Sequence, residues 1–138
     1  MYRKILVAND GSKGGEAALR AAIELAKALG VGLTMICVED LERFPATIDR
    51  VAEAQEAPSV FEDVVAAAKA LAAAEGVALE ALVVEGHPAP RILEFVERDG
   101  YDLLVLGYMG HSALYDRLIG GAASRLVALA PCKVMIVK

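Results

Sequence analysis

Sulfur and amide side chains are scarce in this chain of 138 residues, and acidic residues outnumber basic ones. The two cysteines, Cys37 and Cys132, each lie in an apolar run, so we expect buried, reduced thiols rather than a disulfide framework. The 14 basic and 19 acidic residues give a formal net charge of −5. This balance argues against a general nucleic-acid binder or membrane-surface binder, because both need a basic face.

Long apolar segments are also absent. The apolar run that follows the N-terminus is too short for a signal peptide, and no segment is long enough to span a membrane. The length suits one domain, 1–138, that buries its own core. We therefore expect a cytoplasmic protein with no membrane partner.

Several sequence patterns that would identify an enzyme are missing. The chain has no Gly-x-x-x-x-Gly-Lys-Ser/Thr loop and no Gly-x-Gly-x-x-Gly after its first strand. It also lacks a Gly-x-Ser-x-Gly elbow and a Cys/His cluster spaced for zinc. We therefore expect no catalytic residues and no metal ligands, and a binding protein before an enzyme.

Short apolar runs alternate with longer helical patterns, which is typical of a parallel sheet covered on both faces. The expected strands are 3–9, Leu33–Val38, Ala78–Val84, Leu103–Gly107 and Val134–Lys138. The helices between them begin and end at recognisable residues: Ser12 to Gly30, Pro58 to Gly76, Pro88 to Gly100, and Gly120 to Pro131.

Apolar spacing predicts which side of each later helix is buried. These positions are Val60, Val64, Ala67 and Leu71 in the second helix, Ile92, Leu93 and Val96 in the third, and Leu126, Val127 and Leu129 in the fourth. The acidic segment 39–56 is expected to form a short helix or a flap.

These elements predict a single doubly wound, Rossmann-like α/β fold with five parallel strands in the order 3-2-1-4-5. Doubly wound sheets bind ligands beyond the carboxyl ends of their strands, where the winding reverses. In this order the crevice lies between the first and fourth strands. The loops 9–12 and 107–121 then face each other across it.

The second of these loops has the spacing Gly107-x2-Gly110-x9-Gly120. Glycine lets backbone N–H groups approach an anion, and a helix N-terminus adds partial positive charge. The spacing favours phosphate binding, although turns and helix starts also use glycine. His111 and Arg117 in the same loop either neutralise phosphate or belong to a solvated loop.

The first loop contains Asn9 and Asp10. Asp10 either accepts hydrogen bonds from a ribose and helps to hold a metal, or caps the following helix in a turn. Asn9 either makes a polar contact to a base or ribose or belongs to the turn. His87 lies after the third strand, away from the winding reversal, and is expected to be a turn residue.

The whole chain resembles the universal stress protein family, in its ATP-binding branch. The motifs that carry the resemblance are Val7–Ser12, the Gly86-x-Pro88 turn, the glycine spacing above and the final segment Ala130–Val137. The resemblance implies an ATP-binding stress-response protein that forms homodimers by pairing its last strands, here at Val134–Val137.

In that family the acid after the first strand and the backbone near the end of the second hold the nucleoside, which here implies Asp10 and Val38, with Ala8 and Asn9 alongside. The glycine loop holds the phosphates, which implies Gly107, Gly110 and Gly120. Our candidate ATP-binding residues add His111, Gly121, Ala122 and Ala123, and we expect Mg²⁺ to be shared between the phosphates and water.

One departure from the family pattern bears on affinity. ATP-binding members usually show Ser-Val-Ser/Thr after the third glycine, whereas this chain has Gly121-Ala122-Ala123. Loss of two hydroxyl contacts to phosphate weakens binding by about a hundredfold or more, unless backbone N–H groups compensate. The leading hypothesis is a regulatory switch in which ATP orders 39–56 and 108–119.

Two other hypotheses stay open at this stage. One is a nucleotide-independent dimeric interaction module of the same fold, which the Gly121-Ala122-Ala123 departure supports. The other is a slow ATPase with His111 or Asp10 as the base. A phospho-acceptor receiver domain is disfavoured, because the third strand ends Val83-Val84-Glu85-Gly86 without an aspartate.

Overall fold

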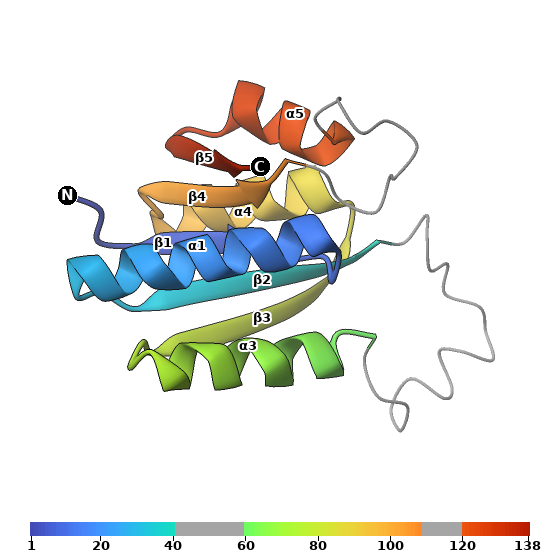
Figure 1. Cartoon of the computed structure of the whole chain (residues 1–138). Coiled ribbons are helices and arrows are strands. Elements are labelled where there is room, and N and C mark those ends of the chain that lie inside the picture. Colours follow the sequence, from blue (N-terminus) through green and yellow to red (C-terminus); the bar gives the residue numbers. More distant parts are fainter. Residues whose placement is uncertain (41–59, 109–119) are drawn as a thin grey trace.

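A computed structural model describes residues 1–40, 60–108 and 120–138 (Figure 1). Five parallel strands form one sheet in the order β3-β2-β1-β4-β5, with α1 and α3 on one face and α4 and α5 on the other. The predicted doubly wound fold is confirmed. In chain order the elements are β1 (Ile5–Ala8), α1 (Lys13–Leu29), β2 (Leu33–Asp40), α3 (Glu62–Ala74), β3 (Leu79–Gly86), α4 (Pro88–Asp99), β4 (Leu103–Gly107), α5 (Gly121–Leu129) and β5 (Lys133–Val137).

The predicted strand boundaries need correction. β1 is shorter than 3–9, and the N–H groups of Arg3 and Lys4 donate to the Asp102 carboxylate, at 2.9 and 3.1 Å. β2 extends two residues past Val38 because it stays paired with β3 as far as Asp40 opposite Gly86. β3 and β5 are each displaced from the predicted ranges by one or two residues. The longer β2 carries Asp40 to the carboxyl edge of the sheet.

The predicted helix signals are confirmed for α1 and α4. The Ser12 hydroxyl accepts a hydrogen bond from the Gly15 N–H at 3.1 Å, which makes Ser12 the N-cap of α1. Gly30 and Gly100 end α1 and α4 in the left-handed conformation, each with a φ of 69°. α3 begins at Glu62, four residues after the predicted start at Pro58, which lies outside the described residues.

Two of the predicted buried helix faces are only partly confirmed: Val64 and Leu71 of α3 pack against the core and Leu126 of α5 is buried, but the other predicted positions are not. In α3 the fully buried positions are Ala68 and Ala72, whereas Ala67 is exposed and Val60 precedes the helix. In α5 Leu126 is buried, but Val127 and Leu129 are 49% and 57% exposed. Both helices contain many alanines and bury only a narrow stripe of residues against the outer part of the sheet. The spacing of apolar residues in the sequence therefore defines the buried side of each helix poorly.

The two faces of the sheet carry separate apolar cores. Ile5, Val7 and Met35 pack under α1 and α3, and Leu6, Leu104 and Phe95 pack under α4 and α5. Sequence spacing identified Ile92 and Val96 of α4 as buried but missed Phe95, and Leu93 is only partly buried. In the described ranges, none of the helices has the length and apolar character needed to cross a bilayer.

The two cysteines differ in burial. Cys37 is fully buried in β2, whereas Cys132 is only partly buried, so the prediction of burial is correct for Cys37 and wrong for Cys132. Both are free thiols. Burial, and to a smaller extent the nearby negative charge of Asp10, raises the pKa of Cys37 to about 12. The neutral thiol is therefore the form that the folded core accepts.

The raised pKa of Cys37 predicts how slowly this thiol reacts, which can be measured in the Cys132→Ser variant, where Cys37 is the remaining cysteine. Because the thiolate is the reactive form, we expect Cys37 to be inert to an aromatic disulfide reagent at pH 8 in the folded protein. It should react fully in denaturant. The raised pKa also means that the neutral thiol favours folding below about pH 9, and that this contribution is lost as the pH rises toward 12. Rapid native-state labelling would contradict the assignment, and the Cys37→Ala/Cys132→Ser variant is the blank.

Candidate functional site

A cavity of about 540 Å³ lies at the carboxyl edge of the sheet, where the winding reverses between β1 and β4. Residues of both predicted loops line it. Among the predicted binding residues, Gly110 and His111 lie outside the described residues, and all the others line the cavity: Ala8, Asn9, Asp10, Val38, Gly107, Gly120, Gly121, Ala122 and Ala123.

The turn between β1 and α1 is built by two side chains. The Asn9 carbonyl oxygen accepts a hydrogen bond from the Gly11 N–H at 3.0 Å, and its amide nitrogen lies 3.6 Å from the Met35 sulfur. Asp10 Oδ1 accepts from the Ser12 N–H at 3.0 Å and also bonds the Ser12 hydroxyl. The turn role is therefore present for both residues. Both also line the cavity, so a ligand contact stays a prediction.

Two glycines let the backbone come close together at this edge. A Cβ on Gly15 would overlap the side chains of Asn9 and Asp10. A Cβ on Gly107 would lie 2.5 Å from the Gly14 carbonyl oxygen, which belongs to the first turn of α1. Gly107 thus has a packing requirement that the sequence did not reveal, independent of any phosphate.

The N-terminus of α5 forms one end of the cavity. Gly120 is the N-cap, and its own N–H donates to the Tyr108 carbonyl at 3.0 Å. Within the described ranges no side chain caps this helix, and its first turn contains no acidic residue. The first residues, Gly121 and Ala122, line the cavity. Because the first N–H groups of a helix have no partner within it, this end is suited to an anion.

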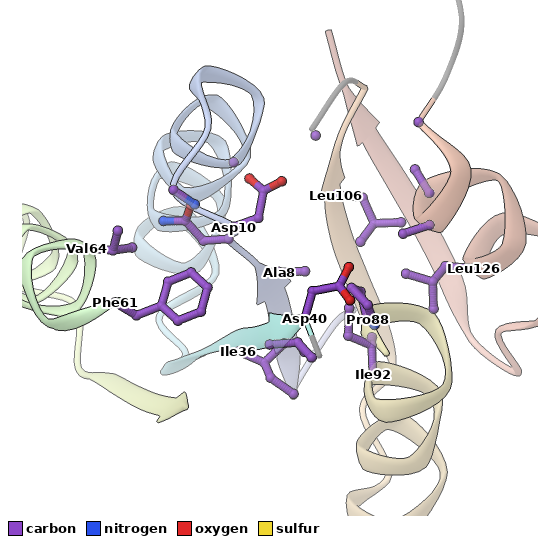
Figure 2. A pocket seen from close by; sticks show the side chains of 18 of the residues that line it. Ala8, Asp10, Ile36, Asp40, Phe61, Val64, Pro88, Ile92, Leu106 and Leu126 are labelled. Carbon is purple, nitrogen blue, oxygen red and sulfur yellow. The ribbon is translucent and has the colours of Figure 1, made fainter. Parts of the chain in front are cut away.

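Most of the cavity lining is apolar, both away from the α5 N-terminus and beside it. Figure 2 shows Phe61 and Val64 beside α3, and Pro88 and Ile92 on α4. Leu106 and Leu126 lie toward α5. The prediction that the Gly86-His87-Pro88 turn lies away from the winding reversal is wrong for Pro88, which lines the cavity. His87 is the N-cap of α4 and fits its predicted place in a turn.

Sequence reasoning missed most of these apolar residues. One signal was present, namely the period-two pattern Ile36, Val38, Asp40, which places three side chains on one face of β2. No sequence signal connected Phe61 to the site. The helix that follows it, α3, covers the face of the sheet opposite to the one that Ile36 and Val38 share.

The charged side chains among the described lining residues are Asp10 and Asp40. Figure 2 shows both carboxylates in the space that separates Phe61 and Val64 from Leu106. No three His, Cys, Asp or Glu residues of the described ranges are grouped as metal ligands. The cavity therefore suits a molecule with a flat apolar body, hydrogen-bond donors for the carboxylates, and an anionic end for α5.

The fold and the site define a doubly wound α/β protein with a ligand cavity at its switch point. The model of the universal stress protein family matches residues 1–138. The chain belongs to this family.

Curated relatives support the assignment over the full chain. It is 31% identical over 141 residues to universal stress protein MJ0531 of Methanocaldococcus jannaschii, covering 100% of this chain and 83% of the relative. It is also 31% identical over 150 residues to universal stress protein YxiE of Bacillus subtilis, with 100% of both chains covered.

Solved structures share the fold. The universal stress protein UspA of Lactobacillus plantarum superposes with a TM-score of 0.81 at 24% identity, covering 99% of this chain and 98% of that chain. A universal stress protein solved in complex with cAMP superposes with a TM-score of 0.75 at 24% identity, covering 99% and 97%.

Proposed function

We propose that the cavity binds an adenine nucleotide and that the protein acts as a stress-response regulator through nucleotide occupancy. The observation that carries this proposal is the position of the α5 N-terminus, which no side chain of the described residues caps, at one end of a largely apolar cavity of suitable size. Family members of the same fold have been solved with cAMP, dAMP and AMP.

In this proposal the phosphates lie against the N–H groups of Gly121, Ala122 and Ala123, and the nucleoside lies against the apolar lining away from α5. ATP is the proposed physiological ligand. Mg²⁺ would be held mainly by phosphate oxygens and water, as Mg²⁺ commonly is in nucleotide sites, with Asp10 as the candidate protein group. The ion would neutralise phosphate charge beside two carboxylates.

The remaining parts of the proposal concern assembly and activity. β5 is the edge strand of the sheet that the described residues form, so a second copy of the chain is proposed to pair along Val134–Val137 in a homodimer. The protein is proposed to act in the cytoplasm. Hydrolysis, if present, is proposed to be slow, because the described lining residues include no histidine, cysteine or lysine.

Isothermal titration calorimetry tests nucleotide binding directly. We expect AMP, and ATP with Mg²⁺, to bind with micromolar Kd, which corresponds to about −8 kcal/mol. A micromolar Kd needs both the contact of the nucleoside with the apolar lining and the contact of the phosphate with α5. Adenosine and inorganic phosphate should therefore each bind more weakly than AMP. Absence of heat with millimolar nucleotide, confirmed by an unchanged melting temperature, would contradict the proposal.

The second candidate is the nucleotide-independent interaction module. The observation that favours it is the lack of hydroxyl side chains at Gly121-Ala122-Ala123, so these three residues can contact phosphate only through their backbone. Native mass spectrometry of gently purified protein separates the two functions. A copurifying adenine nucleotide supports the binding protein, whereas an empty chain that also fails the titration supports the module.

A further inference from the structure

The inference concerns the two edges of the sheet, which carry charges of opposite sign. β3 and β5 are the outer strands, and Figure 1 shows them at opposite ends of the sheet. β3 pairs with β2 along its whole length, and β5 pairs with β4 in the same way. Within the described ranges no further strand pairs with the outer side of either one. The outer side of such a strand has backbone N–H and C=O groups that another strand can pair with.

The two outer strands share one spacing of charged residues. The β3 edge, residues 80–85, has a glutamate at each end and four apolar residues between them. The β5 edge, residues 133–138, has a lysine at each end and again four apolar residues between them. The four charged residues are exposed. The apolar residues are partly buried, apart from Val83, which is 42% exposed. The edges are therefore alike in length and opposite in sign.

The helices next to these strands extend the difference in charge. Residues 60–86, which include α3 and β3, contain five acidic residues and one basic residue. Residues 120–138, which include α5 and β5, contain three basic residues and no acidic residue. In the part of the chain that the structure describes, Glu80, Glu85, Lys133 and Lys138 form no ion pair. The two ammonium groups lie 5.9 and 5.4 Å from the ring centres of tyrosines.

We propose that the β3 edge of one copy of this chain pairs with the β5 edge of another copy. Each end of the new strand pair then contains one glutamate and one lysine, whichever direction the strands take. Two β5 edges would instead bring lysines together, and two β3 edges would bring glutamates together. Opposite charges on neighbouring strands favour pairing, and like charges oppose it. The inference concerns assembly and does not depend on nucleotide binding.

This contact joins two different surfaces, so it adds to the symmetric homodimer proposed above. That homodimer pairs two β5 edges and leaves both β3 edges to further copies. A copy that adds through its β5 edge brings its own β3 edge, so the assembly does not close at two subunits. Its size therefore depends on protein concentration. It also depends on salt, because salt screens the attraction between exposed charges.

Sedimentation velocity of the chain over a range of protein concentrations tests the proposal. In about 25 mM salt we expect species larger than a dimer that grow with concentration, and in about 500 mM salt we expect them to dissociate. The variant Glu80→Lys/Glu85→Lys makes both edges basic and should weaken this association by about 10- to 100-fold. It should retain the symmetric homodimer, whose β5 edges are unchanged.

Two further variants separate strand pairing from net charge. Lys133→Glu/Lys138→Glu makes both edges acidic and should also lose the larger species. The variant with all four reversals exchanges the signs of the two edges and keeps the net charge of −5. It should recover the larger species, and so should an equal mixture of the two double variants, since each offers an edge that is opposite in sign to those of the other.

The matched control is Glu24→Lys/Glu97→Lys. It changes the net charge as much as reversal of the β3 edge does, but at exposed positions of α1 and α4, so it should assemble like the wild type. The proposal is overturned if the wild type in low salt remains a monomer or dimer at the highest protein concentration, or if the larger species persist after reversal of the β3 edge. It is also overturned if the control loses them, or if neither the fourfold variant nor the mixture recovers them.

Discussion

Replacing Gly121 by aspartate is expected to abolish nucleotide binding while leaving the fold intact or more stable. Gly121 is the first residue of α5 and is exposed, and a Cβ built on it meets no atom within 4 Å. A carboxylate here would stand at the helix end where the proposed phosphate lies, within about 4 Å if the two groups come into contact. At an effective dielectric constant of about 20, two like charges at that distance repel by about 4 kcal/mol, so affinity should fall by at least about a hundredfold.

The same substitution should stabilise α5 in the protein without nucleotide. Aspartate in a first turn interacts favourably with the helix dipole, by about 0.3–1 kcal/mol, and glycine is a poor helix former. Calorimetric titration with AMP and thermal melting of the free protein measure the two effects separately. Gly121→Ala is the control, since it adds a side chain without charge and should retain binding. Undiminished affinity in Gly121→Asp would show that phosphate does not lie at α5.

Replacing Gly107 by alanine is expected to destabilise the whole sheet. The added Cβ would lie 2.5 Å from the carbonyl oxygen and 2.6 Å from the carbonyl carbon of Gly14, and both are backbone atoms. A shift of β4 would disturb the cores on both faces of the sheet, and a shift of α1 would disturb the core that it covers. Overpacking of this kind costs about 1–3 kcal/mol, which lowers the Tm by about 4–12 °C for a chain of this size.

Thermal melting checks this prediction against Gly32→Ala. At Gly32 an added Cβ would lie 3.6 Å from the Ala78 carbonyl oxygen, an ordinary contact. This control should be neutral or slightly stabilising, because alanine restricts the unfolded chain more than glycine does. A Gly107→Ala protein as stable as the control would show that the contact between β4 and α1 relaxes easily.

The cavity was predictable from sequence to the extent that it depends on topology. Strand order and the rule of the switch point were enough to bring the Asn9–Asp10 turn and the Gly120 segment together, and the described structure places both at one cavity. Local signals also gave the Ser12 cap and the stops at Gly30 and Gly100. Each of these depends on a few residues close together in the chain.

The errors have a different origin. The burial of Val127 and Leu129 was predicted from apolar character alone, but α5 presents Ala123 and Leu126 to the sheet. The role of Pro88 was missed because α4, which connects β3 to β4, packs across β2, so its first residue reaches the cavity although β3 is the outer strand. Such contacts depend on how elements distant in the chain pack together.

The sequence by itself determined the fold class, the strand order and the family, because periodicity, capping residues and glycine spacing are local and strongly constrained. Only the tertiary structure decided that Gly107 must lack a side chain beside Gly14, and that Phe61 and Asp40 join the cavity. The physical reason is that a cavity is lined by atoms from several elements. Its lining depends on strand ends, helix placement and close backbone contacts, which no short segment of sequence specifies.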